Sequence, residues 1–154
     1  MKIMDMDRVL LLKYSDFKLK DSFQKHIDVL NEFGEVWFGK MGKSPTNNTF
    51  KRVSDGEHYR VIFRSGNKSF FCLVDRISEQ KSDSHYPEYY NEHFYDKNNK
   101  LSVYFRIKEV YPLERGYLKD FVITSTGFNA IETVNKSMSS MFIVHANKDI
   151  DLTK

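Results

Sequence analysis

The sequence predicts an α+β domain with a curled or barrel-like mixed sheet. Five or six segments have the short apolar runs or the alternation of strands, whereas only one long segment has the periodicity and end signals of a helix. These elements do not alternate strand by helix, which argues against a regular parallel sheet. At 154 residues the chain is expected to form one domain with a core of its own.

The first part of the chain is expected to hold one strand and the helix. The strand is predicted at 8–13, an apolar run bounded by charges. The helix is predicted at 21–33, where Asp21 is placed to cap its start, with Gln24 three residues later, and Gly34 to end it. Four apolar side chains are expected to share its buried face: Phe23, Ile27, Leu30 and Phe33.

A second strand and a hairpin are predicted next. The strand covers 35–38, and the polar residues 40–57 after it are expected to form a loop. Alternating apolar residues in 59–65 and 69–77, joined by a turn at Gly66, predict the hairpin. The connection 78–100 is rich in aromatic residues and long for a loop, and long loops are commonly functional.

The last third is expected to add three strands. They are predicted at 101–111, 121–124 and 139–145, with a helical turn at 113–119. Residues 148–154 are interpreted as a polar tail or the start of a linker, which leaves 1–147 as the folded domain.

Composition and charge exclude several classes of function. The net charge of +3 gives a mild positive field, which permits nucleic-acid binding without requiring it. The single cysteine, Cys72, rules out an internal disulfide, and the 5 histidines lack metal-site spacing, so no metal or cofactor is expected. No catalytic motif is found, and no catalytic residue is assigned. Without a signal peptide or a membrane-length apolar run, the protein is expected to be soluble and cytoplasmic, with no membrane partner.

Five motifs follow one another along most of the chain. They are Arg8-Val-Leu-Leu-Leu-Lys-Tyr-Ser-Asp16, Gly34-Glu-Val-Trp37, Phe70-Phe-Cys-Leu-Val-Asp-Arg-Ile-Ser78, Val103-Tyr-Phe-Arg-Ile-Lys-Glu-Val-Tyr-Pro-Leu113 and Met141-Phe-Ile-Val144. Their order and spacing resemble those of YTH and EVE domains of the PUA-like superfamily. The resemblance implies a pseudo-barrel that holds one nucleobase, often a methylated one, in an aromatic pocket. Related EVE-like domains occur at the N-terminus of McrB-type restriction GTPases, where they recognise modified DNA.

The resemblance also implies where the base would bind. Trp37 matches a cage tryptophan of the YTH family, and the residues after the first strand match a segment that hydrogen-bonds the base edge. The second cage wall is not a tryptophan in this chain, and we expect it from the tyrosine-rich residues that follow the hairpin. The predicted base pocket is Trp37, Tyr14, Ser15, Asp16, Phe38, Tyr86, Tyr89, Tyr90 and Phe94. The predicted phosphate contacts are Lys13, Lys40, Lys43, Arg64 and Lys68.

These residues predict a reader without enzymatic activity, which flips a modified adenine or cytosine into a pocket centred on Trp37. Its expected partner is nucleic acid. DNA is favoured over RNA only by the analogy with restriction systems, and a fused or partner GTPase or nuclease is also expected. Two alternatives stay open: an RNA-binding or RNA-processing PUA-like protein with ribonuclease activity, and a barrel that binds another protein.

Each site residue also has a purely structural interpretation. Trp37 is as well explained as a core ring. Without the resemblance, Ser15 and Asp16 are better explained as residues of a turn or cap. The tyrosine-rich residues 86–95 are equally well explained as a loop that packs its own rings. The scattered lysines are in most proteins simply a solvated surface. If Trp37 stacks on a ligand and does not fill the core, Trp37→Ala should weaken binding and leave the fold intact.

Overall fold

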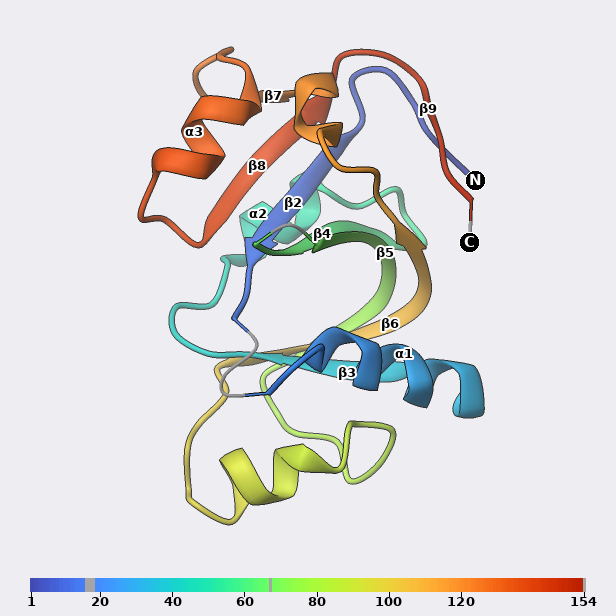
Figure 1. Ribbon diagram of the computed structural model, residues 1–154, viewed down its shortest axis with the longest axis vertical. Helices are drawn as coiled ribbons and strands as arrows, with labels where there is room; N and C mark the ends of the chain where they lie inside the picture. The colour runs from blue at the N-terminus through green and yellow to red at the C-terminus, as the bar shows by residue number, and fades with distance from the viewer. Residues whose placement is uncertain (16–18, 67, 154) are drawn as a thin grey trace. The chain divides into compact units, whose positions relative to one another are not determined.

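The computed structural model describes residues 1–15, 19–66 and 68–153, and its architecture is α+β. In chain order the elements are β1 (Lys2–Ile3), β2 (Arg8–Lys13), α1 (Ser22–Phe33), β3 (Val36–Lys40), α2 (Asn47–Arg52), β4 (Tyr59–Ser65), β5 (Lys68–Ser78), the π-helical turn η1 (Asn91–Tyr95), β6 (Val103–Pro112), the 3-10 turn η2 (Tyr117–Asp120), β7 (Phe121–Ile123), α3 (Ala130–Lys136), β8 (Met141–Ala146) and β9 (Ile150–Asp151) (Figure 1). Seven strands are hydrogen-bonded in the order β3-β6-β5-β4-β2-β8-β7, and β1 pairs with β9. The main sheet is mixed, because β2 runs parallel to β4 and antiparallel to β8.

The chain divides into two compact units. Unit 1 comprises Met1–Ser15, Pro45–Cys72 and Val110–Lys154, and unit 2 comprises Asp16–Ser44 and Leu73–Glu109. The strands β5 and β6 each contribute residues to both units.

Unit 1 is built around β2. This strand pairs with β4 on one side, where Leu10 lies opposite Val61, and with β8 on the other, where Leu10 lies opposite Ile143. All four residues from Val9 to Leu12 are buried. A strand that has neighbours on both edges and is covered on both faces needs apolar residues at every position, which explains the continuous apolar run of β2. Figure 1 shows β2 and β8 side by side, with α3 next to β8.

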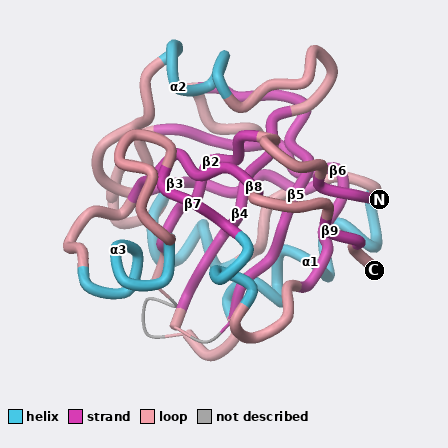
Figure 2. Tube along the Cα trace, turned by 90° about the horizontal axis from the view of Figure 1, so that it is seen from above, coloured by secondary structure: helices cyan, strands magenta, loops and turns pink. Residues whose placement is uncertain are grey.

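Two short helices complete unit 1, and both begin at a side-chain cap. Thr46 accepts a hydrogen bond from the Thr49 amide at 3.2 Å at the start of α2. Asn129 accepts one from the Ile131 amide at 2.9 Å at the start of α3. Figure 2 shows how short these two helices are beside the strands.

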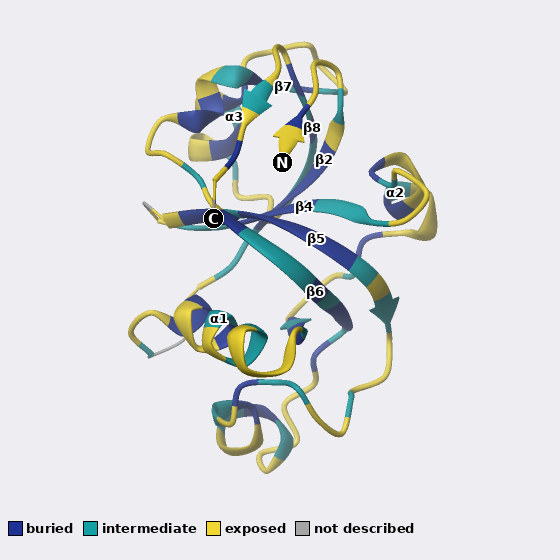
Figure 3. Ribbon diagram, turned by 90° about the vertical axis from the view of Figure 1, so that its right-hand side faces the viewer, coloured by how far each residue is buried: buried dark blue, intermediate teal, exposed yellow. Residues whose placement is uncertain are grey.

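Unit 2 packs α1 against its strands. The helix buries Ser22, Phe23 and His26 and leaves the opposite side in solvent, which Figure 3 shows as a yellow outer face. Gly34 ends the helix in a left-handed conformation, φ +80°, from which its amide donates to the Leu30 carbonyl at 2.7 Å. The next strand, β3, pairs antiparallel with β6.

The structure confirms the α+β class, the predicted helix, the first strand, the hairpin and the long strand β6. It corrects several details. The described residues contain nine strands and not five or six. The predicted loops 40–57 and 78–100 contain α2 and η1, and α3 was missed. Residues 148–154 do not form only a polar tail, since Ile150–Asp151 pair with β1 and Leu152 is buried.

Two predictions about α1 were also wrong. Asp21 does precede the helix, but it has φ +57° and its side chain makes no capping hydrogen bond. Phe33 does not share the buried face, because its side chain is 51% exposed and stacks on His85 with ring centroids 4.7 Å apart. The buried polar residues of the helix are Ser22 and His26, and His26 lies about one helical turn after Phe23.

Candidate functional site

The candidate site is an aromatic assembly in unit 2. Its buried members are Trp37, Tyr90, Phe94, Leu101 and Tyr104, and the partly buried Tyr86, Tyr89 and Tyr95 pack against them. The predicted wall residues Tyr86, Tyr89, Tyr90 and Phe94 therefore do gather with Trp37. They do so from one short segment of the chain, 86–94, which coils into a helical turn ending in η1.

A backbone hydrogen bond at His85 connects the tyrosine-rich segment to β3. The Trp37 amide donates to the His85 carbonyl at 2.8 Å, and His85 Nδ1 lies 3.2 Å from Glu35 Oε2. His85 has φ +61°, a left-handed conformation that costs free energy for a residue other than glycine. The surrounding contacts hold this strained residue, which sets the direction in which Tyr86 and the following rings leave the strand.

Gly39 makes room for the other side of the assembly. It lies opposite Tyr104 in the β3–β6 pairing, and a Cβ at this position would clash with Leu101. Because Gly39 has no side chain, Leu101 and Tyr104 pack directly over the strand.

A buried chain of hydrogen bonds runs through the assembly. His26 Nδ1 lies 3.0 Å from the Ser22 carbonyl, which only accepts, so Nδ1 carries the proton. His26 Nε2 then accepts from the Tyr90 hydroxyl at 2.6 Å, and that oxygen accepts from the Gly39 amide at 3.0 Å. Burial lowers the pKa of His26 to about 4, although the bond to Ser22 opposes this, and burial raises the pKa of Tyr90. Both side chains are therefore neutral at pH 7.

Trp37 is a core residue of unit 2. Its side chain is only 7% exposed, and the Arg106 guanidinium lies 5.8 Å from the centre of its ring. Arg106 is the cross-strand neighbour of Trp37 and is itself held by Asp75 through bonds of 2.8 and 3.0 Å. The interpretation of Trp37 as a core ring therefore agrees with its burial, and the expectation that this ring does not fill the core was wrong.

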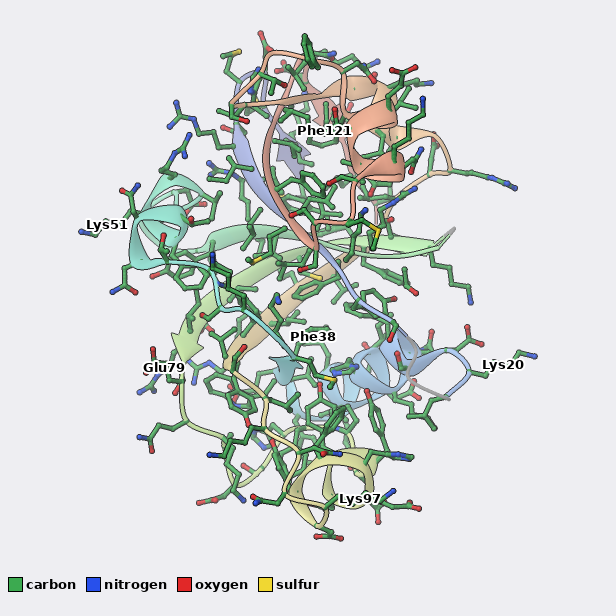
Figure 4. The ribbon with its side chains drawn as sticks, turned by 90° about the vertical axis from the view of Figure 1, so that its left-hand side faces the viewer. Lys20, Phe38, Lys51, Glu79, Lys97 and Phe121 are labelled. Carbon is green, nitrogen blue, oxygen red and sulfur yellow. The ribbon has the colours of Figure 1, made fainter. Side chains whose placement is uncertain are left out.

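The remaining predicted pocket residues divide between the units. Phe38, labelled in Figure 4, packs against α1, with its ring 5.0 Å from that of His26. Tyr14 and Ser15 belong to unit 1. Asp16 lies outside the described residues.

The predicted phosphate contacts divide in the same way. In unit 2, Lys43 is exposed, but Lys40 is 7% exposed and its ammonium donates to the Met41 carbonyl at 2.9 Å. Burial lowers the pKa of Lys40. Lys13, Arg64 and Lys68 belong to unit 1. Lys40 is therefore not available for a surface contact with phosphate in this structure.

Sequence reasoning missed His26, Tyr104 and Lys81, and it included Tyr95 in the tyrosine-rich segment 86–95 but not in the predicted pocket. The Lys81 ammonium lies 4.7 Å from the centre of the Tyr95 ring, at the edge of the assembly. His26 could have been found from its spacing, since it falls three residues after Phe23 on the apolar face of the predicted helix. Tyr104 could not, because its contact with the assembly depends on how segments distant in sequence pack.

Other kinds of site find little support. Within the part of the chain that the structure describes, no three His, Cys, Asp or Glu side chains are grouped as metal ligands would be. Burial raises the pKa of the Cys72 thiol, which makes it a poor nucleophile. A cavity of about 390 Å³ in unit 1 lies between η2 and residues 148–153, and its lining mixes acidic and basic side chains. No described helix is both long and apolar enough to cross a membrane.

Comparison with known proteins gives no match: no protein-family model, no curated protein and no solved structure matches this chain. The resemblance to EVE and YTH domains therefore stays a prediction from the sequence motifs. The aromatic assembly of unit 2 is the candidate site into which the structure gathers most of the predicted pocket residues.

Proposed function

We propose that unit 2 binds nucleic acid by stacking a base on the outer tyrosines of the aromatic assembly. The observation that carries this proposal is the partial burial of Tyr86, Tyr89 and Tyr95, which pack on the buried cluster and keep part of each ring at the surface. Base stacking on an aromatic side chain contributes about 1–3 kcal/mol per base. Rings that are already held in place lose little further side-chain entropy when they bind.

The order within the assembly supports this role. The Tyr86 and Tyr95 rings are nearly perpendicular, at 87° with centroids 5.3 Å apart, and the Tyr86 hydroxyl donates to Asn91 at 2.9 Å. The Lys81 ammonium over Tyr95 adds a positive charge beside these rings. An aromatic surface with a neighbouring cation suits a stacked base and its phosphate.

The finer parts of the proposal rest on the sequence motifs. They are a PUA-like fold of the EVE or YTH type, a preference for a modified base in DNA, no enzymatic activity, and action together with a GTPase or nuclease. In this proposal Trp37 forms the inner support of the assembly, and the outer tyrosines meet the base. Selectivity for a methyl group would come from burying it against these rings, a gain of about 0.8 kcal/mol per carbon.

The test is a binding array of labelled oligonucleotides, single- and double-stranded, of one sequence with unmodified adenine and cytosine or with their methylated forms. We expect Tyr86→Ala and Tyr89→Ala to lower affinity by about 5- to 150-fold, the equivalent of 1–3 kcal/mol. Tyr59→Ala is the matched control, because Tyr59 is also partly buried but lies in unit 1.

Circular dichroism on each variant separates loss of binding from loss of fold. The proposal is wrong if the parent protein binds none of the oligonucleotides, or if the variants in the assembly bind as well as Tyr59→Ala. Equal affinity for modified and unmodified bases would leave base stacking in place and remove the reader function.

A further inference from the structure

Two cations lie side by side in unit 1. Lys13 ends β2 and Arg64 lies near the end of β4, and the two residues are register partners in the parallel pairing of these strands. Register partners in neighbouring strands project their side chains from the same face of the sheet. Both side chains are half-buried.

Neutral groups hold both cations in place. The Lys13 ammonium donates to the Ser137 carbonyl at 2.9 Å and lies 5.4 Å from the centre of the Phe142 ring. The Arg64 guanidinium donates to Asn135 Oδ1 at 3.0 Å and lies 3.4 Å from the Tyr117 hydroxyl. That hydroxyl donates in turn to Ser69, at 3.0 Å, in the buried interior.

No carboxylate of the described residues neutralises the pair. Among the described residues neither Lys13 nor Arg64 forms an ion pair, although two positive charges on one face repel each other. The pKa of Lys13 is lowered, first by burial and then by the charge of Arg64. The Arg64 guanidinium also donates to Ser69 Oγ at 3.4 Å. Both groups still keep unused N–H donors, since an ammonium has three and a guanidinium five.

We propose that Lys13 and Arg64 together bind one phosphate group. The guanidinium offers a planar fork that matches two phosphate oxygens, and the ammonium offers a compact charge to a third. The bound anion would remove the repulsion within the pair. The chemistry is the same for inorganic phosphate and for a phosphodiester, and the site is separate from the base-stacking proposal for unit 2.

The first arm of the test uses inorganic phosphate. We expect phosphate to raise the melting temperature of the parent protein above its value in chloride of equal ionic strength, as any ligand specific for the folded state does. Lys13→Gln and Arg64→Gln should each lower phosphate affinity at least tenfold, and the double variant should lose the response. Lys51→Gln is the matched control, because it removes the same charge from an exposed position of unit 1 (Figure 4).

The second arm uses a single-stranded oligonucleotide at several salt concentrations. If the phosphate comes from a nucleic-acid backbone, the double variant should reduce the slope of log affinity against log salt by about 0.7, the value for one phosphate of a single strand, and phosphate should compete. If the slope is unchanged while the response to inorganic phosphate is lost, the site takes free phosphate. Either outcome supports the phosphate site.

A structural role makes the opposite prediction. If the pair only holds the end of α3 through Asn135 and Ser137, the Gln variants should melt lower without phosphate and keep the phosphate response. That result, or a parent protein that does not respond to phosphate, would overturn the proposal. NMR titration of the parent protein tests the site without any variant: the amides of Lys13 and Arg64 should shift on addition of phosphate, and unchanged amides would also overturn it.

Discussion

The two units bury different kinds of side chain. The core of unit 1 is mainly aliphatic around β2, with Leu10, Leu11 and Val61 fully or almost fully buried, although the rings of Phe63 and Phe121 are also fully buried in this unit. The core of unit 2 is aromatic, and among the described residues it contains three of the four buried polar side chains: Ser22, His26 and Lys40. Buried polar side chains, and with them hydrogen bonds and protonation, therefore contribute more to unit 2 than to unit 1.

The units also differ in how their partly buried charged side chains are paired. In unit 2, Arg106 is paired with Asp75, and Glu35 lies near both Lys108 and His85. The pair Lys13 and Arg64 in unit 1 has no such partner among the described residues. An anion would relieve little repulsion among charges that are already paired, whereas it would relieve the repulsion between Lys13 and Arg64. The proposed phosphate site therefore lies in unit 1.

The largest effect should come from removing one large ring from either core. Trp37→Ala in unit 2 and Phe121→Ala in unit 1 should each lower the free energy of unfolding by about 3–5 kcal/mol, because each leaves a cavity among buried side chains. Chemical denaturation measures the totals. Amide exchange locates the loss: Trp37→Ala should speed exchange at Val36 and Ile107 of unit 2 more than at Leu10. If Trp37→Ala were as stable as the wild-type protein, the ring of Trp37 would not contribute to the core.

Strands with strong apolar patterns were predictable, and helices with weak patterns were not. The run at 8–13 and the alternation at 59–65 match β2 and β4, because burial on one or both faces imposes these patterns directly. The helices α2 and α3 span only 6 and 7 residues and begin at single capping residues, which leaves too little periodicity to detect. The strand β9 was missed because two residues pair with a partner almost 150 positions away.

The second effect is the pH dependence that His26 gives to unit 2. Its pKa is about 4 in the folded protein and about 6.5 when unfolded, so the unfolded chain binds more protons between these values. This contribution is present in full above pH 6.5 and is lost as the pH falls toward 4, by about 3 kcal/mol. Urea denaturation at pH 7 and at pH 4 measures the change.

The matched variant for this experiment is His26→Gln. Hydrogen bonds and charge also lower the pKa of Glu35, chiefly through His85, and this carboxylate adds to acid destabilisation. Gln at position 26 removes only the histidine contribution, so the difference between pH 7 and pH 4 should shrink by about 3 kcal/mol. An equal pH dependence in both proteins would mean that His26 is not buried in neutral form.

The candidate site was predictable in composition and not in arrangement. The sequence places Trp37 and four aromatic residues of the segment 86–94 in one region, and the structure brings them together. The sequence could not show which rings are buried, because Tyr90 and Tyr86 have the same side chain and differ only in what packs over them. Burial of Trp37 likewise depends on Arg106 and on the segment that His85 fastens, and neither contact leaves a local pattern in the sequence.

The smallest effect separates two hydroxyl groups of the same assembly. Tyr90→Phe keeps the ring but leaves His26 Nε2 and the Gly39 amide without their partner, and a buried polar group left unpaired costs about 1–3 kcal/mol. Tyr86→Phe is the control, because its hydroxyl bonds only to Asn91 near the surface and its loss should cost less than about 1 kcal/mol. Chemical denaturation of both variants gives the comparison.

Because Tyr90 donates to the neutral form of His26, Tyr90→Phe should also raise the pKa of His26 above about 4, which NMR titration of the ring measures. Equal stability losses in the two variants, with an unchanged His26 titration, would show that the buried hydrogen-bond chain does not stabilise unit 2.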